Sequence, residues 1–176
     1  MGAILSKSGI KLLRAFLYKP HFEMHQAEII TVTGLSKVTV MNLLKTYRDS
    51  GLLRCNKRGD LKLYSIEFDN SVVRQLKVFL IVSELYWELK DMASEDIEVH
   101  LFGSAARGDD TENSDIDLLV LTSRDKQSVR YKFTEVKNSM NREVNPVVYS
   151  NIEFAALPYT DKAFYYSIEK DLIRLI

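Results

Sequence analysis

Apolar residues recur at helical spacing in three runs within the first fifty residues. Pro20 ends the first run, and Gly34 lies just after the second. Ser36 is placed to cap the third at its amino end, and Gly51 to close it. The pattern therefore predicts three short helices, which we place at Ser8 to Tyr18, His25 to Val32 and Lys37 to about Ser50.

Two short alternating segments follow the third predicted helix, as expected for β-strands. They are Leu52 to Cys55 and Leu61 to Ile66. The stretch Lys57-Arg58-Gly59-Asp60 between them predicts a hairpin turn, in which Gly59 can adopt a positive φ. Three helices followed by a basic hairpin are the plan of a winged helix-turn-helix domain, which we assign to residues 1–67.

A longer helix is predicted from Ser71 to Met92, with Asp69-Asn70 as its cap. Its apolar residues cover a broad part of the circumference, so we expect it to pack on more than one surface. This helix serves either as the connector between two modules or as a dimer interface. We assign residues 68–92 to it.

The remaining residues, 93–176, mix short strands with helices. Strands are predicted at Glu98 to Phe102, Ile116 to Leu121 and Glu143 to Tyr149, a helix at Val129 to Met140, and a mostly helical tail from Asn151 to Ile176. The expected fold class is α+β: a winged helix-turn-helix, a linker helix, and a carboxy-terminal domain with a small mixed sheet flanked by helices.

Charge divides the chain in the same way. Residues 1–67 carry a net charge of +6 (11 Lys/Arg against 5 Asp/Glu), and residues 68–176 carry −6. This asymmetry suggests two modules with different partners. The longest apolar run, Val78 to Val82, is far too short for a membrane span, and no secretory signal is visible. With a single cysteine, Cys55, no internal disulfide can form, which fits a cytoplasmic protein.

The string Gly103-Ser104-Ala105-Ala106-Arg107-Gly108 follows a predicted strand. Gly103 lets the backbone approach a ligand, and backbone N–H groups at the start of a helix attract phosphate. The Ser104 hydroxyl adds a donor, and Arg107 adds a cation within one helical turn. Gly103, Ser104 and Arg107 are therefore candidate phosphate-binding residues.

Asp115 and Asp117 open the next predicted strand and lie two residues apart, so both carboxylates point to one face. Two such carboxylates repel each other unless a cation lies between them. Mg²⁺ suits oxygen ligands of this kind and takes its remaining ligands from phosphates and water; Mn²⁺ is an alternative. A phosphate-binding turn beside metal-binding carboxylates suits in-line attack at phosphorus. In the competing interpretation, the aspartates merely end a strand at the surface, which leaves the glycine–serine string unexplained.

This whole string resembles the nucleotidyltransferase superfamily that includes DNA polymerase beta, and especially its minimal bacterial and archaeal members. The family pattern is Gly-Ser followed by Asp-x-Asp at the start of an apolar strand, which reads here as Gly103-Ser104 and Asp115-Ile116-Asp117. The resemblance covers roughly Ile97 to Ile176. It implies that Gly103 and Ser104 contact a nucleoside triphosphate, while Asp115 and Asp117 hold metal ions and serve catalysis.

One departure from the family pattern bears on activity. The family uses a third carboxylate on a neighbouring strand as metal ligand and base, and the matching position here falls on Asn145. An amide cannot accept a proton as a carboxylate does. Glu143, two residues earlier on the same strand face, is the candidate substitute, and the alternative for it is a solvated charge at the strand start.

The third predicted helix has the features of a DNA-recognition helix. We expect Val38, Val40, Leu44 and Tyr47 to face the core. The residues then expected to face DNA are Lys37, Thr39, Asn42 and Lys45. Lys57 and Arg58 on the wing would contact backbone phosphate. The segments Thr33 to Val40 and Ser50 to Leu53 are similar to those of winged-helix transcription regulators, although a winged helix used for protein contacts is the alternative.

Two functions stay open at this stage. One is an enzyme that transfers a nucleoside monophosphate from NTP–Mg²⁺ to a hydroxyl acceptor. The other is a catalytically weak or inactive, nucleotide-sensing transcriptional regulator. The resemblance to minimal nucleotidyltransferases also implies toxin–antitoxin modules, in which the chain would be an antitoxin with a small helical protein partner. A homodimer is a further expectation, because winged-helix proteins often bind symmetric DNA sites.

Overall fold

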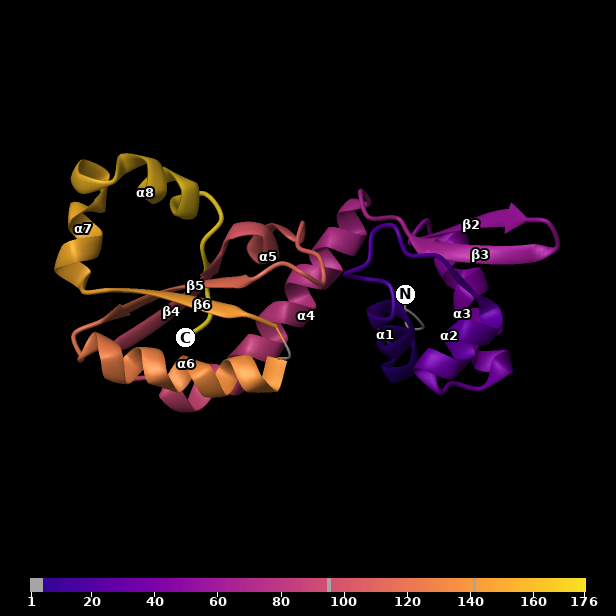
Figure 1. Ribbon diagram of the computed structural model, residues 1–176, viewed down its shortest axis with the longest axis horizontal. Coiled ribbons are helices and arrows are strands. Elements are labelled where there is room, and N and C mark those ends of the chain that lie inside the picture. The colour runs from indigo at the N-terminus through magenta and orange to yellow at the C-terminus, as the bar shows by residue number, and fades with distance from the viewer. Residues whose placement is uncertain (1–4, 95, 141) are drawn as a thin grey trace. The chain divides into compact units, whose positions relative to one another are not determined.

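The computed structural model describes residues 5–94, 96–140 and 142–176 (Figure 1). It divides into two compact units, with the boundary between Arg74 and Gln75. Each unit has its own sheet: a three-stranded one in the first and a four-stranded one in the second. The α+β class expected from the sequence is therefore confirmed, and the two units are described separately.

The amino-terminal unit contains three helices and a small antiparallel sheet. The helices are α1 (Lys7–Arg14), α2 (Gln26–Thr33) and α3 (Lys37–Asp49), and the strands are β1 (Met24–His25), β2 (Leu53–Arg58) and β3 (Leu61–Ile66). The strand order is β1-β3-β2, and Arg58 pairs with Leu61 across a two-residue turn. Gly59, the first turn residue, has a φ of 61°. This is the winged helix-turn-helix arrangement that the pattern of the sequence predicts.

Local caps set the helix-turn-helix boundaries. The ring nitrogen Nδ1 of His25 accepts hydrogen bonds from the first turn of α2. Gly34 ends α2 in the left-handed conformation, with a φ of 61°, which glycine adopts without steric cost. Ser36 Oγ then accepts a hydrogen bond from Thr39 N at 3.2 Å and starts α3. The turn between the two helices is therefore encoded locally.

The buried face of α3 differs from the expected one at Val38. Val40, Leu44 and Tyr47 are buried as predicted, and Leu43 joins them, but 68% of Val38 is exposed. Two residues that are two positions apart lie about 200° apart around a helix, so Val38 and Val40 cannot share a face. The prediction for Val38 was wrong, and this valine lies on the outward face of α3.

The carboxy-terminal unit takes in most of α4 (Ser71–Leu89). After the short helix η1 (Lys90–Met92), the elements are β4 (Ile97–Phe102), α5 (Gly103–Arg107), β5 (Ile116–Thr122), α6 (Lys126–Met140), β6 (Val144–Tyr149), α7 (Asn151–Thr160), α8 (Lys162–Glu169) and β7 (Ile173–Arg174). The strand order is β6-β5-β4-β7, with β5 and β6 parallel and the other pairs antiparallel. The expected mixed sheet is present, and Pro146 lies on its edge strand β6, where a missing N–H is tolerated.

Helices cover both faces of this sheet (Figure 1). One face packs against α4 and α6, in a core that includes Ile81, Leu85 and Phe133. The opposite face packs against α7 and α8, around Leu119 and Ile168. The carboxy-terminal half of the linker helix α4 is therefore part of the core of this unit.

Among the described residues, no single helix has the length and apolar composition to cross a membrane. The bent pair α2 and α3 meets the test only when the two helices are taken together.

Candidate functional site

The candidate site lies where β4, β5 and β6 meet at the end of the sheet that carries α5. Strand register places Asp117 between Phe102 of β4 and Asn145 of β6. Asp115 immediately precedes β5 and is exposed, whereas Asp117 is half-buried. Because α5 begins directly after Phe102, the glycine–serine turn starts beside Asp117.

Gly103 makes the closest approach to this aspartate. Its φ is 74°, and a methyl group added to it would lie 2.9 Å from Asp117 Oδ2. Side chains essentially never approach an oxygen that closely, so the site requires both the left-handed backbone and the missing side chain. The turn and the second aspartate of the motif therefore converge on one place.

The electrostatics of the acidic pair favour a bound cation. Burial raises the pKa of Asp117, the nearby charge of Asp115 raises that pKa further, and the contact with Asn145 opposes both effects. Asn145 Nδ2 donates a hydrogen bond of 2.9 Å to Asp115 Oδ2. A cation between the two carboxylates would relieve their repulsion, and hard oxygen donors suit Mg²⁺ or Mn²⁺.

The acidic pair would not form a complete metal site by itself. Within the described part of the chain, no group of three or more His, Cys, Asp or Glu side chains is arranged to hold a metal ion. A magnesium ion held by two carboxylates takes its other ligands from water or from substrate phosphates. The donor set therefore fits an ion that binds together with a nucleotide.

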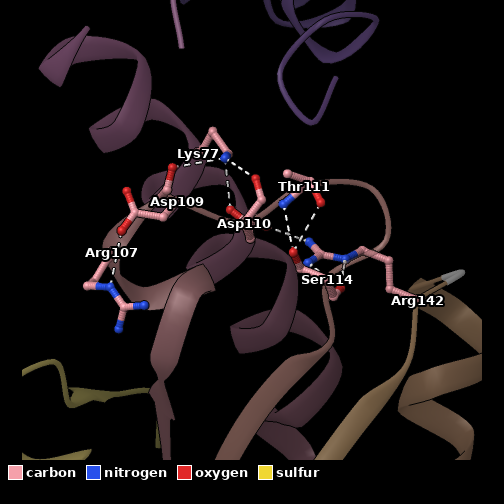
Figure 2. A network of polar contacts seen from close by, with 8 residues as sticks. Lys77, Arg107, Asp109, Asp110, Thr111, Ser114 and Arg142 are labelled. Carbon is pink, nitrogen blue, oxygen red and sulfur yellow. Dashed lines mark hydrogen bonds and ion pairs between the residues drawn. The ribbon is translucent and has the colours of Figure 1, made fainter. Parts of the chain in front are cut away.

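Ser104 and Arg107 lie on α5, which begins at Gly103, and they have different surroundings. Ser104 is half-buried, and its carbonyl oxygen accepts a hydrogen bond from Asp109 N at 2.9 Å. The Arg107 guanidinium contacts two carboxylates. Its Nε lies 3.1 Å from Asp109 (Figure 2), and its Nη1 lies 2.6 Å from Asp171. Both carboxylates raise its pKa, Asp171 more strongly. Arg107 therefore ties α5 to the segment that follows α8.

Glu143 lies just before β6 and is exposed. Its carbonyl oxygen accepts a hydrogen bond of 2.9 Å from Ile116 N, which continues the pairing of β5 and β6 beyond the strand end. This backbone contact places Glu143 opposite the segment between the two aspartates.

The candidate DNA-contacting residues lie on the surface of the amino-terminal unit. Lys37, Asn42 and Lys45 are exposed on α3. Thr39 is half-buried, and its hydroxyl lies 2.9 Å from Ser36 Oγ, so it contributes to the helix cap.

The wing carries the remaining candidates. Lys57 and Arg58 are exposed, and they belong to strand β2 rather than to the turn. Arg58 Nη2 lies 3.5 Å from Glu23 Oε2. A groove of about 550 Å³ separates α2 from β3 and is bordered by Lys37 and Lys62. The unit therefore offers cations on both α3 and the hairpin.

The sequence patterns did not indicate a role for three charged residues near the site, Lys77, Asp110 and Arg142 (Figure 2). Lys77 and Asp110 are each 1% exposed. One signal in the sequence could have revealed Lys77, because it lies four residues from both Val73 and Ile81, which are buried on α4. A lysine on the buried face of a helix indicates a buried charge partner.

Comparisons with known proteins identify the carboxy-terminal unit. A sequence model of the family described as nucleotidyltransferase domain matches residues 82–174, and no curated protein matches the chain. A predicted DNA-binding transcriptional regulator from E. coli has 26% identity and a TM-score of 0.37, over 43% of this chain and 80% of its own.

Two further solved structures share parts of the chain. The antimony-specific transcriptional repressor AntR has 20% identity and a TM-score of 0.42, over 49% of this chain and 76% of its own. A complex of MNT antitoxin with tri-AMPylated HEPN toxin from Shewanella oneidensis gives 18% identity and a TM-score of 0.35, over 58% of this chain and 71% of that one. The family match spans more than half of this chain and includes Gly103, Asp115 and Asp117. The chain therefore belongs to the nucleotidyltransferase domain family and carries a winged helix-turn-helix at its amino-terminal end.

Proposed function

We propose that the carboxy-terminal unit binds a nucleoside triphosphate with Mg²⁺ or Mn²⁺ and transfers its nucleoside monophosphate to a hydroxyl acceptor. The observation that carries this proposal is the convergence of Gly103 on Asp117: a Cβ added to Gly103 would lie 2.9 Å from Asp117 Oδ2. Asp115 and Asp117 would hold the metal. Gly103 and Ser104 would contact the triphosphate through the backbone and the hydroxyl.

The transfer replaces one phosphorus–oxygen bond by another. The acceptor oxygen attacks the α-phosphorus, the bond to the β-phosphate breaks, and pyrophosphate leaves with the electron pair. When bound, the metal neutralises charge on the phosphate oxygens. In our proposal the acceptor proton passes to the Glu143 carboxylate, because Asn145 offers no base at the position where the family has a carboxylate.

Arg107 has a specific place in this proposal. Its Nε contact with Asp109 is the longer of its two ion pairs and joins two side chains that are 41% and 38% exposed. The contact with Asp171 is shorter, and Asp171 is only 14% exposed. We propose that Nε exchanges Asp109 for a phosphate oxygen while Nη1 stays on Asp171.

Calorimetric titration with Mg–ATP tests nucleotide binding. We expect Asp115→Ala to abolish the metal-dependent binding and to leave the circular dichroism spectrum unchanged. Glu88→Ala is the matched control, because this acid is exposed on α4 and lies outside the acidic pair and its loop. Equal affinities in the unaltered protein and in Asp115→Ala would refute the proposed site.

A second function is favoured by Asn145. Its amide donates to Asp115 Oδ2 at 2.9 Å, so the position offers a hydrogen-bond donor where transfer needs a base. The domain would then sense a nucleotide without transferring it, and the winged helix would convert occupancy into DNA binding.

A radiolabel transfer assay with Mg²⁺ or Mn²⁺ and cell extract separates the two functions. Transfer that disappears in Asp117→Ala identifies the enzyme. If no component of the extract is labelled under any condition, and calorimetry still detects nucleotide binding, the domain is a sensor.

We further propose that the amino-terminal unit binds DNA through α3 and the wing. The exposed cations Lys37, Lys45 and Lys57 would contact phosphates and Asn42 a base edge, with Arg58 and Thr39 at the margin of the contact. In an electrophoretic shift assay, Lys37→Glu/Lys57→Glu should weaken binding. Lys7→Glu is a matched control on α1, outside both the helix and the wing. Identical shifts for the unaltered chain and the double variant would contradict this mode of binding.

The winged helix-turn-helix suggests one protein partner, and the resemblance to minimal nucleotidyltransferases suggests another. We propose a homodimer on symmetric DNA and a small helical protein, encoded next to this chain, as the acceptor. Size-exclusion chromatography with light scattering tests the first, and co-expression with the neighbouring gene product tests the second.

A further inference from the structure

A buried ionic network holds the loop that leads into the acidic pair (Figure 2). It begins at Lys77 on α4, which is 1% exposed. The Lys77 ammonium group donates to the carbonyl oxygen of Gly108 at 2.9 Å and to that of Asp110, and it lies 3.0 Å from the Asp110 carboxylate. All three contacts fall on the loop that follows α5.

The network continues from Asp110 to Arg142. The Asp110 carboxylate lies 2.8 Å from Arg142 Nη1, so one buried carboxylate is shared by two cations. The Arg142 guanidinium also donates to the carbonyl oxygen of Ser114, at 2.7 Å through Nη2 and at 3.1 Å through Nε. Ser114 Oγ in turn accepts a hydrogen bond from Thr111 N at 2.9 Å. The loop is therefore held at both ends.

These contacts lie directly next to the acidic pair. Ser114 is the residue before Asp115, and Arg142 lies three residues before Asn145. The contact of Arg142 with Ser114 therefore joins the start of β5 to the start of β6, where Asn145 hydrogen-bonds to Asp115. The Arg142 guanidinium therefore holds the backbone directly before Asp115 and itself belongs to the segment that leads to Asn145.

Stability alone is a weak reason for such a network. Charges lose their hydration on burial, and well-packed apolar residues often serve a fold equally well or better. Burial lowers the pKa of Lys77, and the Asp110 carboxylate opposes this effect. A fixed backbone position is the one thing that apolar packing would not reproduce here, because Lys77 and Arg142 donate to carbonyl oxygens of the loop.

We propose that Lys77 and Arg142 are positioning residues, which hold residues 108–115 through the loop carbonyl oxygens and the Asp110 carboxylate so that the Asp115 carboxylate shares a cation with Asp117. Neither residue touches the nucleotide. The inference rests on the proposed nucleotide binding, and it assigns a functional role to Lys77, which lies outside the segment 82–174 that matches the family.

Two variants test this role in the full-length protein. Lys77→Met keeps an unbranched side chain and leaves Asp110 with one cationic partner, Arg142, so we expect the chain to fold. Arg142→Lys retains a charge for Asp110, but a lysine cannot donate through two nitrogens in the planar geometry of a guanidinium group. Lys132→Met, at an exposed position of α6, is the matched control.

The measurement is calorimetric titration with Mg–ATP at a temperature where circular dichroism shows each variant to be folded. We expect both variants to lose roughly 10–100-fold in affinity, as is usual when a residue that orients a metal ligand is replaced. Lys132→Met should bind like the unaltered chain. A purely structural network would instead lower the melting temperature and leave the affinity of the folded protein unchanged.

The outcomes separate the two proposals. If the unaltered chain binds Mg–ATP, Asp115→Ala does not, and Lys77→Met and Arg142→Lys bind normally, the positioning role is refuted and the nucleotide site stands. If the unaltered chain binds no Mg–ATP, the nucleotide site is refuted, and the positioning role falls with it.

Discussion

Replacement of Gly103 by alanine tests the convergence of the turn on the acidic pair. The left-handed backbone at this position, with a φ of 74°, costs an L-residue about 1–2 kcal/mol. The added methyl group would also lie 2.9 Å from Asp117 Oδ2, which forces the carboxylate to move. Rotation of a side chain by about 30° from its preferred rotamer costs about 0.5–1.5 kcal/mol. We therefore expect Gly103→Ala to destabilise the carboxy-terminal unit by about 1.5–3.5 kcal/mol.

Gly59 offers a matched control for the backbone contribution. Its φ of 61° is also left-handed, but no atom lies within 4 Å of the position where a methyl group would be added. Gly59→Ala should therefore destabilise the amino-terminal unit by about 1–2 kcal/mol, which is the cost of the backbone conformation alone. Hydrogen exchange followed by mass spectrometry measures the two units separately in the full-length chain.

The two variants should differ most clearly in binding. Displacement of the Asp117 carboxylate should weaken Mg–ATP affinity at least about tenfold, which corresponds to about 1.4 kcal/mol. Gly59→Ala should bind Mg–ATP like the unaltered protein. If Gly103→Ala matches Gly59→Ala in both stability and affinity, the close approach of the turn to Asp117 has no functional meaning and the proposed site is wrong.

Three other predictions follow from contacts of this structure. Asn145→Asp should tighten Mg²⁺ binding in calorimetry and raise any transfer rate, because it adds a carboxylate beside Asp115; weaker Mg²⁺ binding would argue against a metal there. Asp110→Asn should lower the free energy of unfolding by about 3–5 kcal/mol in urea titrations, and by more than Lys77→Met does, because it leaves the buried Lys77 and the partly buried Arg142 without a carboxylate; the opposite order would exclude a shared charge. The Lys126 ammonium and two Ser150 contacts hold the pKa of Glu153 at about 2, below its ordinary 4.5. The stabilisation that this carboxylate contributes is therefore present above about pH 4.5 and lost as the pH falls through about 2, and Lys126→Met should raise the pKa in a ¹³C NMR titration.

Local signals in the sequence were sufficient for most of the fold. Ser36 and Asn70 cap helices in the structure, Gly34 ends one, and Gly59 makes the hairpin turn, because each acts within a few residues of its own position. The expectation that Asp115 and Asp117 share one face rests in the same way on the period of a strand; in the structure Asp117 lies on β5 and Asp115 directly before it.

The rest depends on contacts between distant segments, which the sequence does not display. Lys77 and Asp110 are 33 residues apart, and Asp110 and Arg142 are 32 apart. Asp110 and Arg142 resemble ordinary solvated charges when read alone, and only the spacing of Lys77 from Val73 and Ile81 marks that lysine as buried. Arg107 likewise reads as a free cation until Asp171, 64 residues later, is seen beside it.

The packing of α4 has a consequence for the modular exchange of such domains. Ile81, Leu85 and Leu89 of this helix fill the core of the nucleotidyltransferase unit, and Lys77 reaches the loop before its acidic pair. A chimera that joins this unit to a different DNA-binding head must therefore keep the helix from at least Gln75 onward. A junction placed at the start of the family match would remove a buried lysine together with part of the helix that supports the sheet.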